Sequence, residues 1–248
     1  MTCKLLGALA LAALAGSASA EIAQFAGSYV VDAQTGQTTF SSRAGFSVYN
    51  STAGAVAGGI SSSTLSTTWG DNCGITQTGT LEEFTFAVFN STSGGNTGSI
   101  LTANYSFDFR RFVANTSMGS FTGSVNFGTG LNAGFYSTIT FVNLSTLAIP
   151  VVLDTLNMEV RQQRTSQTGT STRQGVVFTS AGTTVGTDLA PTAFYKNDSA
   201  SPPAGYYNLT GTPPPNVALL YNLKVLPAPG SLALLGVGGL IAGRRRRA

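Results

Sequence analysis

Histidine is absent from this chain, and charged residues are scarce. The 248 residues include no histidine, two cysteines and 9% Asp, Glu, Lys and Arg, whereas an average soluble domain has about 25% charged residues. Without histidine, the chain has no Ser-His-Asp or Cys-His catalytic group, no histidine metal triad and no histidine proton shuttle. The length allows one domain or a small pair, and it is ample for a buried core.

The N-terminus has the pattern of a secretory signal peptide over residues 1–20. Lys4 supplies a positive charge, Leu5 to Ala15 is an uncharged apolar run, and Ala18-Ser19-Ala20 has the small-x-small form of a signal peptidase site. We predict cleavage after Ala20, with Ala18 and Ala20 recognised and Glu21 as the mature N-terminus. The alternative is an uncleaved anchor, although a span needs about 20 apolar residues.

The C-terminus carries three features in a fixed order over residues 227–248. Pro227-Ala228-Pro229-Gly230 is followed by the uncharged stretch Ser231 to Gly243, and then by Arg244, Arg245, Arg246 and Arg247. As a helix, the uncharged stretch is about 20 Å long, so with its flanks it makes a short, strained membrane span. The positive-inside rule places the arginines, as a membrane stop, on the cytoplasmic side.

This ordered set resembles the PEP-CTERM sorting signal of bacterial exported proteins, and the resemblance covers Pro227 to Arg247 only. The family's usual Pro-Glu-Pro reads Pro227-Ala228-Pro229 here. The resemblance implies an exosortase, a membrane cysteine protease that removes the tail, and a bacterium with an outer membrane and exopolysaccharide production. The alternative is an ordinary C-terminal tail anchor.

The body between these ends, residues 21–226, is weakly acidic and sparsely charged. It holds eight basic and ten acidic residues, a net charge of −2, so the pI near 9.0 comes from the arginine tail. Such a body lacks the basic stripe of a nucleic-acid binder. Cys73 is its one cysteine, which excludes an intramolecular disulfide and leaves a buried thiol, an intermolecular disulfide or a reactive nucleophile as alternatives.

Period-two alternation of apolar and polar residues predicts β-strands through the body. The expected strands are 25–31, 40–49, 84–88, 105–110, 121–127, 135–141, 156–161 and 217–225. Gly/Ser/Thr-rich turns separate them, with an irregular excursion expected over 180–215, and no amphipathic helical repeat is present. This pattern predicts an all-β fold, an antiparallel β-sandwich or jelly roll in which two sheets bury their inner faces.

No combination of residues in the body predicts catalysis, a cofactor or a metal site. Ten carboxylates offer pairs for a glycosidase in any β domain, and Glu82 and Glu83 point to opposite faces of a strand. Calcium is an alternative, because Asp71-Asn72 and Asn197-Asp198 place oxygen ligands in expected loops, but without EF-hand or RTX spacing such Asx-rich segments are ordinary turns.

Aromatic residues in turn-like segments are the candidate glycan contacts. Trp69 lies in an expected Gly-rich loop, and Tyr206 and Tyr207 follow Pro202-Pro203; their rings are expected either in the core or stacked on sugars. Three arginines around an expected loop at 162–172 are further candidates, for an anionic polysaccharide: Arg161, Arg164 and Arg173.

We therefore expect an exported, non-enzymatic protein of the cell surface or extracellular matrix. Its expected partners are signal peptidase, an exosortase and exopolysaccharide in a biofilm, and its expected location is a transient inner-membrane anchor followed by the cell surface or medium. The exopolysaccharide role comes from the resemblance and from no residue of the body. The alternatives are a secreted carbohydrate-binding module and, third, a secreted hydrolase.

Overall fold

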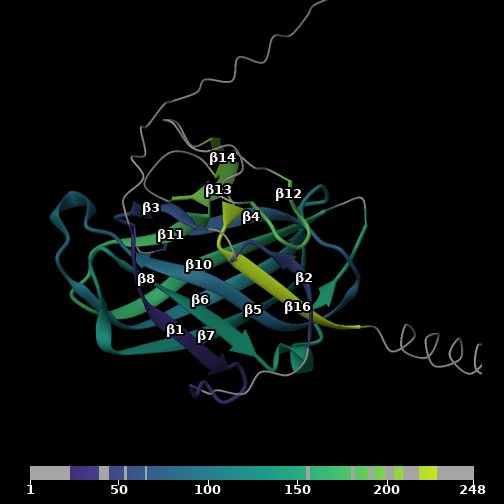
Figure 1. The fold of residues 1–248 in the computed structure, drawn as a ribbon, viewed down its shortest axis with the longest axis horizontal. Helices are drawn as coiled ribbons and strands as arrows, with labels where there is room; N and C mark the ends of the chain where they lie inside the picture. The colour runs from purple at the N-terminus through teal and green to yellow at the C-terminus, as the bar shows by residue number, and fades with distance from the viewer. Residues whose placement is uncertain are drawn as a thin grey trace, which may run out of the picture.

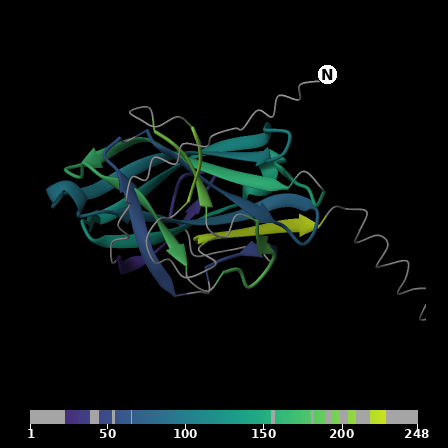
Figure 2. The same ribbon diagram turned by 90° about the horizontal axis from the view of Figure 1, so that it is seen from above.

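The computed structural model describes residues 23–38, 45–52, 55–64, 66–154, 157–179, 182–189, 193–198, 204–208 and 218–227. The fold of these residues is all-β, with strands arranged in two sheets as a β-sandwich (Figures 1 and 2). Two short 3-10 turns, η1 (Ser93–Gly95) and η2 (Leu144–Leu147), are the helical elements of the described part. No helix in that part has the length and apolar character to cross a membrane.

Sheet A is built around the long strand β5, which pairs with β8 on one side and with β16 on the other. Strand β1 adds to β8 in parallel, and the other pairings are antiparallel. The strands are β1 (Gln24–Asp32), β2 (Phe46–Asn50), β3 (Val56–Ser62), β5 (Gly79–Asn90), β8 (Phe135–Val142), β9 (Pro150–Val151), β11 (Gln174–Thr179), β15 (Ala218–Leu219) and β16 (Tyr221–Pro227).

Sheet B is antiparallel, with the order β14-β13-β4-β10-β6-β7, and β12 pairs with the end of β4. Its strands are β4 (Thr68–Gly74), β6 (Ser99–Arg111), β7 (Thr116–Asn132), β10 (Met158–Gly169), β12 (Thr187–Asp188), β13 (Ala193–Asn197) and β14 (Gly205–Asn208). Segments more than one hundred residues apart in the chain, such as β4 and β13, therefore lie side by side.

Aromatic rings from both sheets form the centre of the core. Phe107 and Phe121 of sheet B lie 4.7 Å apart between ring centroids, and Phe107 meets Phe86 of sheet A at 4.8 Å. Gly123 makes room for this contact layer, because a Cβ there would come within 2.3 Å of the Phe141 ring. Each large ring that leaves water contributes a few kcal/mol of hydrophobic stabilisation, so these strands are held face to face chiefly by aromatic packing.

The alternation of apolar and polar residues predicted the all-β class correctly, but three expected loops are strands. Residues 162–169 continue β10, the segment of Trp69 and Cys73 is β4, and the expected irregular excursion contains β12, β13 and β14. The segment Gly128-Thr129-Gly130, whose composition is typical of a turn, lies inside β7, where Gly128 and Gly130 adopt positive φ at a register shift. Glycine and threonine in these segments therefore do not mark the ends of strands.

Candidate functional site

A polar groove of about 280 Å³ lies on the outer face of sheet B. Its lining comes from four neighbouring strands, β13, β4, β10 and β6, whose outward residues stand in register. Because alternate residues of a strand share a face, the lining side chains other than Gln162 point away from the aromatic core, whereas Gln162 is buried and stands opposite the core residues Trp69 and Phe107. The lining residues are Thr68, Ser106, Asp108, Arg161, Gln162, Gln163, Tyr195 and Asn197.

One row of paired residues crosses the sheet along the groove. Tyr206 is opposite Tyr195, Tyr195 is opposite Gly70, and Gly70 is opposite Arg161, which in turn is opposite Asp108. The Arg161 guanidinium carbon lies 3.8 Å from the centroid of the Tyr195 ring, within the range of a cation–π contact. A stacked Arg-Tyr pair therefore forms one wall of the groove.

Gly70 permits this stacking. A Cβ at position 70 would lie 3.0 Å from the Val160 carbonyl oxygen, 3.1 Å from Arg161 Cγ and 3.3 Å from Tyr195 Cβ. A larger residue at this position would make Arg161, Tyr195 or β4 shift by a few tenths of an ångström. The glycine therefore eases the close packing of Arg161 on Tyr195 and is not a turn signal.

A buried carboxylate anchors the wall from below. The Glu159 side chain is fully buried; Arg161 Nη2 donates to its Oε2 at 2.8 Å, and the Tyr206 hydroxyl donates to its Oε1 at 3.0 Å. Burial raises the pKa of the Tyr206 hydroxyl, and the neighbouring Glu159 carboxylate raises it further. Tyr206 stays protonated and keeps donating to Glu159, which fixes the carboxylate under Arg161.

The Asp108 carboxylate on the opposite side of the groove is held in the same way. It accepts hydrogen bonds from Arg110 and from the Ser117 hydroxyl. Arg110 also donates to the backbone and side-chain oxygens of Asn115, and Arg161 reaches the Asn115 side chain at 3.4 Å. The charged groups of the groove are thus paired with partners in the protein, and the network is continuous from β14 to β7.

The aromatic candidates from the sequence take different positions. Trp69 is 2% exposed and packs against Phe194, with the Lys196 ammonium 5.6 Å from its ring, so its ring lies in the core, the first of the two expected positions, while its segment is a strand and the expected loop is wrong. Tyr206 is half-buried, with its ring 5.9 Å from Tyr195 and 5.3 Å from Phe112. The backbone of Tyr207 pairs with Phe194 in the β13–β14 ladder.

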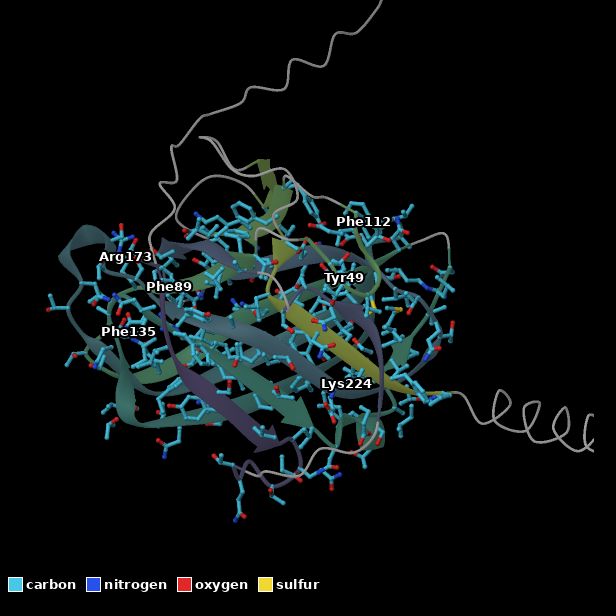
Figure 3. All side chains as sticks on the ribbon, viewed as in Figure 1. Tyr49, Phe89, Phe112, Phe135, Arg173 and Lys224 are labelled. Atoms are coloured by element: carbon cyan, nitrogen blue, oxygen red, sulfur yellow. The ribbon has the colours of Figure 1, made fainter. Side chains whose placement is uncertain are left out.

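The three arginines proposed for an anionic polysaccharide do not form one patch. Arg161 lines the groove and is paired with Glu159, whereas Arg164, three residues along β10, is 1% exposed and faces the core. Arg173 lies on the opposite side of the molecule from Phe112, which borders the site (Figure 3). The geometry therefore contradicts a shared basic surface.

Buried acids of sheet B lie under β12 and β15. Asp71 is 1% exposed on β4 and accepts hydrogen bonds from the backbone N–H groups of Asn72 and Leu219, both at 2.8 Å. Burial, and then the charge of Asp188, raises the pKa of the Asp71 carboxyl well above its ordinary value. Asp71 lies in a strand rather than in the loop expected for a calcium ligand. Within the described ranges, no three His, Cys, Asp or Glu side chains are placed to share a metal ion.

Cys73 is buried beside this acid, and Tyr49 lies next to it. Burial raises the pKa of the Cys73 thiol well above its ordinary value, and Asp71 raises it further. A thiol of raised pKa and 0% exposure has little thiolate and no access to a second molecule, which favours the buried, inert thiol among the three alternatives.

A second hollow, of about 440 Å³, lies between the end of β1 and strands β6 and β7. Its carboxylate, Asp32, accepts hydrogen bonds from the N–H groups of Gln34 and Thr35 and from the Asn143 side chain, and the two backbone bonds are the chief cause of its lowered pKa. The two backbone bonds close the Asx turn that follows β1, so the Asp32 carboxylate is already hydrogen-bonded within its own turn. The polar groove is therefore the stronger candidate site.

The sorting and processing residues lie at the ends of the body. Pro227 is the last residue of β16, in register with Gly79. The other predicted processing residues are outside the described residues: Ala18, Ala20, Glu21, Ala228, Pro229, Gly230, Arg244, Arg245, Arg246 and Arg247.

Comparisons with known proteins leave the family open. No protein-family model matches the chain, and no curated protein matches it. Two solved structures of infectious bursal disease virus, the Gx strain and the VP2 subviral particle, are 15% and 12% identical, cover 85% and 82% of this chain, and have TM-scores of 0.21 and 0.18. The chain spans about half of each viral chain, 52% and 46%, and likeness at this level carries no argument about function.

Proposed function

We propose that the chain is an exported, non-enzymatic protein of the cell surface or extracellular matrix, processed by an exosortase and associated with exopolysaccharide. One observation carries the proposal: the three C-terminal features stand in order at Pro227 to Arg247, behind a predicted signal peptide. The described fold is in keeping with it, because β1 begins at Gln24 and β16 ends at Pro227. The described sandwich supports the proposal, because its strands lie within the interval between the two proposed targeting segments.

In this proposal, four arginines stop export with the body outside. Moving an arginine to the centre of a membrane helix costs about 2.5 kcal/mol or more, and Ser231 to Gly243 is shorter than the about 20 residues of an ordinary span, so its flanks have to complete it. Replacing Arg244 to Arg247 with serine is expected to release uncut precursor as a soluble protein. Replacing them with lysine, as the matched control, is expected to keep it in the membrane.

Fractionation and mass spectrometry of both variants test the export mechanism. The expected wild-type product begins at Glu21 and lacks the arginine tail. A serine variant that stays membrane-bound and is trimmed at the wild-type rate overturns the arginine stop, and a secreted product that begins at Met1 overturns the signal peptide.

The groove on sheet B favours a second function, carbohydrate binding by the body. Its walls are a stacked Arg-Tyr pair and hydroxyl, amide and carboxylate groups, which match the donors and acceptors of a hydroxyl-rich ligand such as a sugar. Hydrolysis is a weaker candidate, because glycosidases use two carboxylates across the bond. Asp108 is the acid that lines the groove, and it is committed to Arg110. A binding function therefore fits this geometry better than catalysis.

A further inference from the structure

A polar stripe of five residues crosses five strands of sheet B, and four of them, all except Thr122, line the groove. Asn197 is opposite Thr68, Thr68 is opposite Gln163, Gln163 is opposite Ser106, and Ser106 is opposite Thr122. All five side chains are exposed or half-buried. Neighbouring strands are about 4.8 Å apart, so the stripe is about 19 Å long. Its hydroxyl and amide groups both donate and accept hydrogen bonds, and Gln163 Nε2 already donates to the Ser66 carbonyl oxygen at 2.6 Å, which leaves its amide oxygen as the acceptor for a ligand.

The row beside the stripe is charged but balanced. Arg161 is neutralised by Glu159 at 2.8 Å, and Asp108 is neutralised by Arg110. An acidic ligand in the groove would meet the Asp108 carboxylate, and a cationic ligand would meet the Arg161 guanidinium. Since neither sign of charge is left uncompensated, the groove offers hydrogen bonds without a net electrostatic preference.

The walls are fixed before any ligand arrives. The guanidinium of Arg161 is held from three sides, by Glu159, by Asn115 and by the Tyr195 ring. Glu159 is in turn held by Tyr206, whose ring packs edge-on to Phe112. Side chains that are already ordered lose little conformational entropy on binding, which favours a ligand that binds through many weak hydrogen bonds.

We propose that this groove binds a segment of a neutral polysaccharide. The inference rests on the proposed association with exopolysaccharide and deepens it by naming the ligand class. A sugar hydroxyl donates and accepts, which matches the hydroxyl, amide and carboxylate groups of the lining, and the planar Arg161 guanidinium offers a flat surface to a sugar ring. A protein partner fits less well, because interface hot spots are buried aromatic or arginine anchors and the Tyr195 ring is 8% exposed beneath Arg161.

Binding is tested on the purified full-length chain by affinity gel electrophoresis and titration calorimetry. The neutral probes are dextran, mannan, xylan and a mixed-linkage β-glucan, and the acidic probes are alginate and polygalacturonate, each at low and high salt. The expected result is saturable binding to at least one neutral polysaccharide, with the same affinity at both salt concentrations, because screening acts on charge and not on neutral hydrogen bonds.

A double variant, Ser106→Ala with Gln163→Ala, removes two hydrogen-bonding groups from the centre of the stripe. The expected loss of affinity is about tenfold or more. The matched control is Thr85→Ala with Thr140→Ala, which removes a hydroxyl pair joined at 2.9 Å across β5 and β8 in the other sheet. The control is expected to bind as the wild type does, and thermal unfolding checks that both proteins are folded. Asn197→Ala, at the exposed end of β13, is a milder second variant with an expected severalfold loss.

Three results overturn the proposal. Binding to alginate or polygalacturonate alone, weakened by salt, shows an acidic ligand instead; unchanged binding by the groove variants places the site elsewhere; and no binding to any neutral probe removes the site. None of these results touches the export proposal, which is tested by fractionation of the arginine variants.

Discussion

Within the part of the chain that the structure describes, Arg164 is a buried cation without a counter-ion, and its removal is expected to stabilise the protein. The side chain is 1% exposed and faces the core from β10. Its Nη1 donates to the Gln167 side chain, while Nε and Nη2 have no hydrogen-bond partner among the described residues. The Tyr105 hydroxyl in the same region is also buried without a partner. Burial of a charge in this manner costs free energy.

The size of this free-energy cost follows from the pKa of the Arg164 guanidinium. Burial lowers the pKa of the Arg164 guanidinium to about 10, a drop of roughly two and a half pKa units, or about 3 kcal/mol. Because the folded-state pKa is depressed and the group is a base, this cost is present at every pH below about 10, including neutral pH. Arg164→Met removes it and keeps an apolar chain of similar length, but loses the charge-assisted bond to Gln167, worth about 1.5 kcal/mol or more.

The net expectation for Arg164→Met is a gain of up to about 1.5 kcal/mol in unfolding free energy, and a rise of up to about 5 °C in Tm. Urea unfolding at pH 7 measures the first and calorimetry the second. The matched control is Arg161→Met on the same β-strand. It leaves the fully buried Glu159 carboxylate without its cation, and its unfolding free energy is expected to fall by about 2–4 kcal/mol. A loss of more than about 1 kcal/mol in Arg164→Met would refute the reasoning, since it would show that the guanidinium is compensated.

Three further perturbations follow from the core. Thermal stability is expected to fall as pH rises from 5 to 9, because the raised pKa of Asp71 makes its protonated form stabilising and that contribution is lost as pH rises through the folded-state pKa; Asp71→Asn should flatten this component of the profile, and an unchanged slope contradicts it. Phe107→Ala, at 0% exposure, is expected to cost about 3–5 kcal/mol in urea unfolding, whereas Val113→Ala, at 62% exposure, should stay within about 0.5 kcal/mol. Cys73 is expected to react with a chromogenic thiol reagent only after unfolding, and rapid labelling of the native protein would show that the burial is wrong.

Alternation of residue type was sufficient to predict the fold class and most of the core. Phe107, Phe121 and Phe141 stand at alternate positions with polar neighbours, so their inward direction follows from the period of a strand. Turn residues were a weaker guide to where strands end, because glycine occurs both in turns and at strand positions where neighbouring side chains need its space. At Gly70 it lets Arg161 and Tyr195 meet, and at Gly123 it makes room for Phe141. Neither position is a chain reversal.

The candidate groove could not be predicted from the sequence, for a different reason. Its residues come from four strands that meet only through long-range pairing: Asn197 of β13 is opposite Thr68 of β4, and β10 lies between β4 and β6. The order of strands in a sheet is not encoded in local periodicity. Trp69 is a second example. Its neighbours Gly70 and Asn72 are typical of a loop, but they belong to strand β4 because they pair with β10, a strand that lies far away in the sequence.

The last strand connects the fold to the proposed processing. β16 lies between β5 and β2, and its final pairings are Leu226 with Thr80 and Pro227 with Gly79. Its inward residues, Tyr221, Leu223 and Val225, are at most 1% exposed, so the strand contributes to the core along its length. A cut beyond Pro229 would therefore leave every pairing of β16 in place, whereas a cut before Leu223 would remove buried side chains and unfold that part of sheet A. Processing at the proposed motif is compatible with a body that is already folded, because the motif begins where the core contribution of the strand ends.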